Sequence, residues 1–97
     1  MTTFSKLDSY LDDNRQNHLD QLFELLRIPS ISADSSKKVE MDQAAEWVAN
    51  RFRLAGLKTE LIPGGGPALV YAETPPVPGK PVVLVYGHYD VQPADPL

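Results

Sequence analysis

The chain has 97 residues, which is enough for one small domain. Nine basic and thirteen acidic residues give a formal net charge of −4, which argues against a nucleic-acid or anionic-membrane surface. There is no cysteine, so disulfides and thiolate catalysis are excluded. Because no signal-peptide core and no apolar run of membrane-spanning length is present, we expect a soluble, cytoplasmic protein without a membrane partner.

Two amphipathic helices are predicted in the first half of the chain. Apolar residues recur at helical spacing from Phe4 to Leu26, and Pro29 ends this helix because the residue before a proline avoids the α region. A second helix is expected from about Val39 to Ala55, after a polar loop. Its apolar stripe consists of Met41, Ala45, Val48, Phe52 and Ala55, with Trp47 beside it. Gly56 follows as a stop in the left-handed conformation.

Three strands are predicted in the second half. Residues 58–62 alternate polar and apolar side chains, residues 68–72 form a second short strand, and Gly64-Gly65-Gly66 forms the turn between them. Residues 74–81 hold four prolines and one glycine, so they are expected to be irregular. The apolar run from Val82 to Tyr86 then predicts a strand buried on both faces.

The order of two helices and three strands predicts the α/β fold class. In such a layered architecture the helices cover a sheet whose central strand is apolar. Neither an internal repeat nor a domain boundary is visible, so residues 1–97 are expected to belong to a single domain.

His88 and Asp90 are the candidate functional residues. They follow Gly87 at the end of the predicted buried strand, where α/β proteins place their chemistry. Side chains two residues apart in an extended backbone point to the same side, so Asp90 can hold one ring nitrogen of His88 and leave the other free for a metal. A structural histidine bonded to an aspartate at a turn gives the same pattern. The pair alone cannot form a zinc site, because catalytic zinc requires three protein ligands.

Other polar features are predicted to be structural. His18 lies beside the apolar stripe of the first helix without a second ligand at helical spacing. The glycine triplet lacks the Lys and Ser/Thr of a phosphate loop, and residues 75–78 form a stiff connector. Ser30 and Ser32 lack the Gly-x-Ser-x-Gly context of a nucleophilic serine.

Two segments resemble the M20 family of zinc-dependent metallopeptidases. Residues 82–93, with Gly87-His88-Tyr89-Asp90 at their centre, provide the strongest match. Residues 22–32 are similar to the family's first helix and the turn that follows it, and residues 90–95 look most like the dipeptidase, or carnosinase-like, branch. The resemblance implies the N-terminal part of a layered α/β/α zinc-peptidase catalytic domain, in which the three strands belong to a mixed sheet.

The resemblance also implies roles for the two candidate residues. His88 is one ligand of a two-zinc centre, a site that cobalt or manganese could also occupy. Asp90 is the catalytic-site carboxylate that holds and polarises His88. The remaining ligands, the catalytic Glu and a lid domain that mediates homodimerisation lie further along full-length relatives. The isolated 97-residue segment is therefore expected to be inactive.

The implied reaction is metal-assisted hydrolysis of amide bonds in dipeptides or small peptides. Two alternatives stay open: an N-acyl amino-acid deacylase of the same family, and a stand-alone α/β module without catalytic activity.

Overall fold

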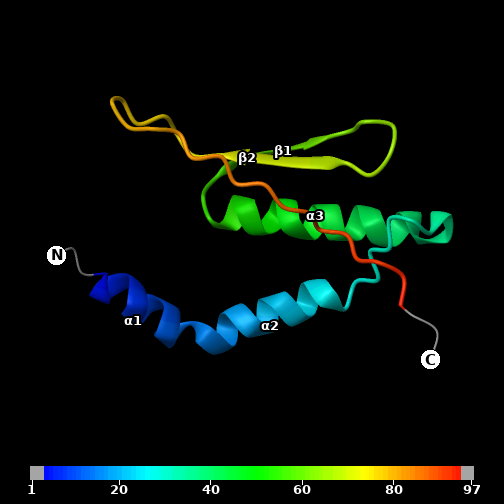
Figure 1. Ribbon diagram of the computed structural model, residues 1–97, viewed down its shortest axis with the longest axis horizontal. Coiled ribbons are helices and arrows are strands. Elements are labelled where there is room, and N and C mark those ends of the chain that lie inside the picture. Colours follow the sequence, from blue (N-terminus) through cyan, green and yellow to red (C-terminus); the bar gives the residue numbers. More distant parts are fainter. Residues whose placement is uncertain (1–3, 95–97) are drawn as a thin grey trace.

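Helices precede an antiparallel hairpin in the computed structural model, which describes residues 4–94 (Figure 1). The described elements are α1 (Ser5–Asp13), α2 (Arg15–Leu26), the short 3-10 helix η1 (Ser35–Lys37), α3 (Lys38–Leu54), β1 (Lys58–Ile62) and β2 (Leu69–Glu73). Asp95, the last residue of the segment that resembles the dipeptidase branch, lies outside the described residues. No helix within residues 4–94 has both the length and the apolar character needed to cross a bilayer.

The hairpin of β1 and β2 confirms the prediction of two short strands joined by the glycine turn. Lys58 lies opposite Glu73, and Leu61 opposite Val70. Each strand alternates exposed and half-buried residues, because successive side chains point to opposite faces. Helix α3 packs against both strands and covers one face of the hairpin (Figure 1). The turn includes Gly65 at φ 83°, a left-handed conformation that favours glycine.

Helix α3 supplies the small core. Its buried apolar residues are Met41, Ala44, Ala45 and Ala49, none more than 5% exposed. These positions fall on one helix face, since side chains three or four residues apart are neighbours. Three of the four are alanines, so the helix can lie close to the sheet. The predicted stripe was wrong at Phe52, which is 37% exposed, and at Ala55, which is also exposed, because the buried face of the helix runs through Ala44 and Ala49 instead.

The end of α3 confirms the predicted glycine stop. Gly56 has φ 88°, and its N–H donates to the carbonyl oxygen of Arg53. The next N–H, from Leu57, donates to the carbonyl oxygen of Phe52. This pair of bonds is a Schellman motif, which satisfies helix carbonyls that would otherwise lack a partner.

The single helix predicted from Phe4 to Leu26 was wrong at Asn14, where α1 ends and α2 begins. The Asn14 side-chain amide donates a 2.9 Å hydrogen bond to the carbonyl oxygen of Tyr10, and its backbone lies at φ −106°, ψ 10°. Asparagine side chains compete in this way with the backbone bonds of a helix. The two helices form an N-terminal arm on the side of α3 away from the hairpin (Figure 1).

Most apolar residues of the N-terminal arm are exposed in the described part of the chain. They are 40–60% exposed: Phe4, Leu7, Leu11, Leu19, Leu22, Phe23 and Leu26. The radius of gyration is 16.5 Å, against about 13 Å for a compact domain of this length. The extended shape explains why the amphipathic pattern does not lead to burial here.

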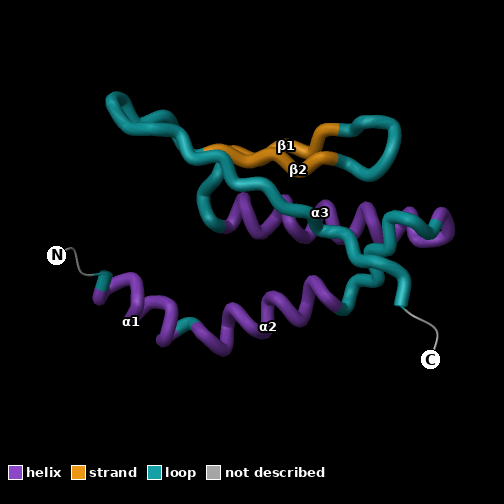
Figure 2. Tube along the Cα trace, in the orientation of Figure 1, coloured by secondary structure: helices purple, strands orange, loops and turns teal. Residues whose placement is uncertain are grey.

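The buried strand predicted from Val82 to Tyr86 is absent. These residues, hereafter the apolar strip, are 81–96% exposed and follow an irregular path (Figure 2). A strand forms by pairing, and among residues 4–94 the sheet consists of β1 and β2 alone. The predicted three-stranded mixed sheet was therefore wrong for the described residues. The α/β class is confirmed, while the layered zinc-peptidase arrangement stays a prediction.

Candidate metal-ligand site

The candidate site forms where the turn after α2 meets the segment after the apolar strip. The Val91 N–H donates a 2.9 Å hydrogen bond to the carbonyl oxygen of Ser30, and Ile31 and Val91 form an isolated parallel bridge. The Ser30 hydroxyl lies 3.2 Å from the carbonyl oxygen of Tyr89, to which it donates. Ser30 is 1% exposed. A buried serine therefore holds the backbone on both sides of Asp90.

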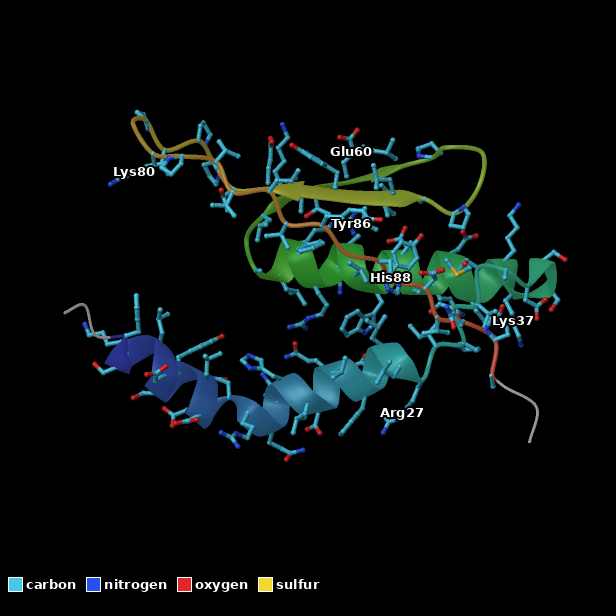
Figure 3. All side chains as sticks on the ribbon, viewed as in Figure 1. Arg27, Lys37, Glu60, Lys80, Tyr86 and His88 are labelled. Carbon is cyan, nitrogen blue, oxygen red and sulfur yellow. The ribbon has the colours of Figure 1, made fainter. Side chains whose placement is uncertain are left out.

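His88 and Asp90 make the contact that their spacing predicted. The Nδ1 atom of His88 lies 2.8 Å from Oδ1 of Asp90 and 3.1 Å from the Asp90 carbonyl oxygen. Since an ionised carboxylate only accepts hydrogen bonds, Nδ1 carries a proton, and in the neutral imidazole Nε2 then keeps a free lone pair. The side chain of His88, labelled in Figure 3, is 78% exposed. An exposed imidazole with a free Nε2 fits the requirements of a metal ligand.

Ser32 is the second residue whose side chain forms a hydrogen bond with the Asp90 carboxylate. Its hydroxyl donates to Oδ2 of Asp90 at 2.5 Å, so both carboxylate oxygens are engaged. The pKa of Asp90 is lowered from its ordinary value, first by the hydrogen bond from Ser32 and then by the one from His88. From the sequence, Ser32 was predicted only not to be a nucleophile, and its contact with Asp90 was not predicted. The signal available was its place in the segment at residues 22–32 that resembles the peptidase family.

Tyr89 points away from the other two side chains and anchors the segment to the hairpin. Its hydroxyl donates a 2.7 Å hydrogen bond to the carbonyl oxygen of Ala68. Partial burial raises the pKa of Tyr89, and the negative charges of Asp42 and Asp90 raise it further. The alternation predicted for an extended backbone is therefore present at residues 88–90.

The described residues supply one candidate ligand rather than a complete metal centre. Within residues 4–94, no group of three or more His, Cys, Asp and Glu side chains is placed to hold a metal ion. His18 does not join His88, because it lies on α2 with its ring 5.9 Å from the ring of Tyr10. Full metal coordination therefore needs donors in addition to His88.

Comparisons with known proteins relate the chain to metallodipeptidases. No protein-family model matches it. It is 29% identical over 102 residues to the Cys-Gly metallodipeptidase dug1 of Schizosaccharomyces pombe, and the alignment covers 95% of this chain and 21% of that protein. The Cys-Gly metallodipeptidases DUG1 of Candida albicans and Saccharomyces cerevisiae are 29% and 30% identical, each over 96% of this chain and 23% and 21% of their own lengths.

A comparison of folds gives the same result. The solved structure of the dipeptidase Dug1p from Saccharomyces cerevisiae matches with a TM-score of 0.79 and 26% identity, over 87% of this chain and 20% of that one. The chain thus spans about a fifth of the length of the relatives that it matches. In both sequence and fold, the chain is similar to a part of the metallodipeptidases.

Proposed function

We propose that this chain forms part of a metal-dependent dipeptidase, in which His88 is a metal ligand and Asp90 orients it. The observation that carries the proposal is the 2.8 Å contact between His88 Nδ1 and Asp90 Oδ1, which leaves Nε2 free. It occurs in a chain whose relatives in three fungi are named Cys-Gly metallodipeptidases. The proposal includes membership of the M20 peptidase family and the layered catalytic domain of that family.

The roles of the two residues follow from their hydrogen bond. By accepting from Nδ1, Asp90 fixes the tautomer of His88 and makes Nε2 a better electron-pair donor. The bound metal would supply an activated water and a polarised amide carbonyl. An imidazole ligand binds zinc well, and it also binds cobalt and manganese with lower affinity. His88 is the one ligand proposed among the described residues, so further donors would be needed to complete the site.

The proposed substrates are dipeptides or other small peptides, with Cys-Gly the first to test because the relatives' names give it. We also propose that the complete enzyme works as a homodimer. Both proposals concern the whole protein.

The test uses the longest natural polypeptide that contains this sequence. It is stripped of metal, reloaded with zinc, cobalt or manganese, and assayed against Cys-Gly, other dipeptides and N-acyl amino acids. We expect dipeptide hydrolysis that depends on added metal, and a stoichiometric loss of one bound metal ion in His88→Ala. His18→Ala is the matched control, because His18 lies on α2 away from the site. Hydrolysis of acyl substrates alone would identify a deacylase instead, and a metal-loaded protein without hydrolase activity would refute the proposal.

A further inference from the structure

We propose that Ser32 is a positioning residue, which acts through Asp90 to hold His88 in the tautomer and orientation needed for metal binding. This inference rests on the proposed function, since it assigns a third residue to the same site. Its basis is a continuous chain of hydrogen bonds from the Ser32 hydroxyl through the Asp90 carboxylate to the His88 ring.

The two hydrogen bonds together restrain Asp90 more than either could alone. Ser32 donates to Oδ2 at 2.5 Å, while His88 Nδ1 donates to Oδ1 at 2.8 Å. The terminal torsion of an aspartate is broad, so a carboxylate held at one oxygen can rotate. With a donor on each oxygen, rotation would break one charge-assisted hydrogen bond. The plane of the carboxylate, and with it the direction of the His88 ring, is thereby fixed.

The backbone explains how Ser32 reaches a residue that is 58 positions away in the sequence. The parallel bridge between Ile31 and Val91 places the two chain segments side by side. The buried Ser30 fixes their register through its bonds to the Tyr89 carbonyl oxygen and the Val91 N–H. Ser32 then lies next to Asp90 as a consequence of the bridge.

The exposure of the two serines separates structural support from positioning. Ser30 is 1% exposed, so its hydroxyl and backbone belong to the folded core of the turn. Ser32 is exposed, and loss of its hydroxyl would leave no buried polar group without a partner. The fold therefore does not require the Ser32 hydroxyl, whereas the orientation of Asp90 does.

The test measures the tautomer of His88 directly, in the metal-free 97-residue chain with ¹⁵N-labelled histidine. The chain has two histidines, so His18 serves as an internal reference. Nitrogen chemical shifts, recorded where the imidazoles are neutral, give the ratio of Nδ1–H to Nε2–H forms for each ring. We expect the Nδ1–H form to predominate at His88 in the unmodified chain. In Ser32→Ala, we expect the ratio of Nδ1–H to Nε2–H forms at His88 to fall severalfold, while the His18 signals stay unchanged.

A second pair of variants separates the hydroxyl from the shape of the side chain. Ser32→Thr keeps the hydroxyl and should retain the tautomer ratio, while Ser32→Val replaces it by a methyl group and should resemble Ser32→Ala. An unchanged tautomer ratio at His88 in both Ser32→Ala and Ser32→Val would overturn the positioning role. A fall of the ratio in Ser32→Thr as large as that in Ser32→Ala would overturn it too.

The dipeptidase assay of the full-length protein reports on the proposed function independently. If the unmodified protein cleaves dipeptides, we expect Ser32→Ala to lower kcat/KM and Ser32→Thr to restore it. Activity that is fully retained in Ser32→Ala would refute the positioning role and leave the proposed function standing. Failure of the unmodified protein to cleave dipeptides would refute the proposed function, whereas the tautomer ratios test Ser32 in either case.

Discussion

The Tyr89 hydroxyl donates a hydrogen bond of 2.7 Å to the carbonyl oxygen of Ala68, at the residue just before β2. Tyr89 lies between His88 and Asp90 in the sequence and points to the opposite side. Its anchorage to the hairpin therefore fixes the rotation of the backbone that carries the two site residues. The hairpin, which packs against α3, is connected to the site through this bond.

Removal of that hydroxyl should destabilise the chain measurably. We expect Tyr89→Phe to lower the free energy of unfolding by about 0.5–1.5 kcal/mol, the usual net contribution of one intramolecular hydrogen bond. Urea denaturation followed by circular dichroism measures the change. Tyr86→Phe is the control, since the side chain of Tyr86, labelled in Figure 3, is 89% exposed. This variant should leave the midpoint unchanged. Equal effects of the two variants would contradict the anchor.

The close contact between α3 and the hairpin predicts intolerance to larger side chains. Ala49 is 0% exposed, and we expect Ala49→Leu to destabilise the chain by about 1–3 kcal/mol, because extra methylene groups force the packed layers apart. Gln43→Leu adds a leucine on the exposed part of the same helix and should change stability by less than about 0.5 kcal/mol. A stabilising effect of Ala49→Leu would show that the two layers do not pack as described.

Substitution of Asp90 should affect metal binding more than folding. In the full-length protein, we expect Asp90→Asn to reduce metal affinity or kcat/KM by about ten- to a hundredfold, because the amide no longer polarises the His88 ring. Isothermal titration with zinc and steady-state kinetics measure these quantities. Asp34→Asn is a suitable comparison, because the Asp34 carboxylate accepts its hydrogen bonds from Ser36 and makes none with His88 or Ser32. An Asp90→Asn enzyme with unchanged affinity and rate would refute the role.

Acid should weaken the contacts of Asp90. The hydrogen bonds from Ser32 and His88 lower the pKa of Asp90 below 3.8, so its contribution to stability is present above that value and is lost as the pH falls through the lowered pKa. We expect the free energy of unfolding to decrease as the pH falls below about 4, and the decrease to be smaller in Asp90→Asn. Urea denaturation over this range tests the expectation. An identical pH dependence in both proteins would contradict it.

The apolar strip should make the isolated chain self-associate. Its residues are 81–96% exposed, and exposed apolar segments of this kind promote association. We expect sedimentation velocity to show larger species as concentration rises, and the double variant Val83→Lys, Val85→Lys to shift the chain toward monomer. Val77→Lys, in the proline-rich connector, should have no such effect. A chain that stays monomeric at all concentrations would refute the expectation.

Local signals predicted most of the elements. The alternation in β1, the glycine turn and the stop at Gly56 each depend on a few neighbouring residues, and the structure has all three. The break at Asn14 was missed, because the apolar periodicity continues through it while a side-chain hydrogen bond ends the helix. The strand at residues 82–86 was wrong for a different reason. Apolar composition indicates a tendency to be buried, but a strand also needs a pairing partner, and the structure shows none for these residues within residues 4–94.

The site could be predicted only in part for the same reason. The contact of His88 with Asp90 follows from their spacing of two residues. The contact of Ser32 with Asp90 depends on the bridge between Ile31 and Val91, which no local pattern encodes.

The distance along the sequence between Ser32 and Asp90 has a consequence for the order of folding. The hairpin and its packing on α3 involve short separations, whereas the bridge at Ile31 and Val91 closes a loop of about sixty residues. Loop closure has an entropic cost that grows with the flexible length, and prior folding of α3 and the hairpin shortens that length. Alignment of His88 should thus be a late folding event. In a newly synthesised chain, the His88 ring would reach its final orientation only after α3 and the hairpin have folded.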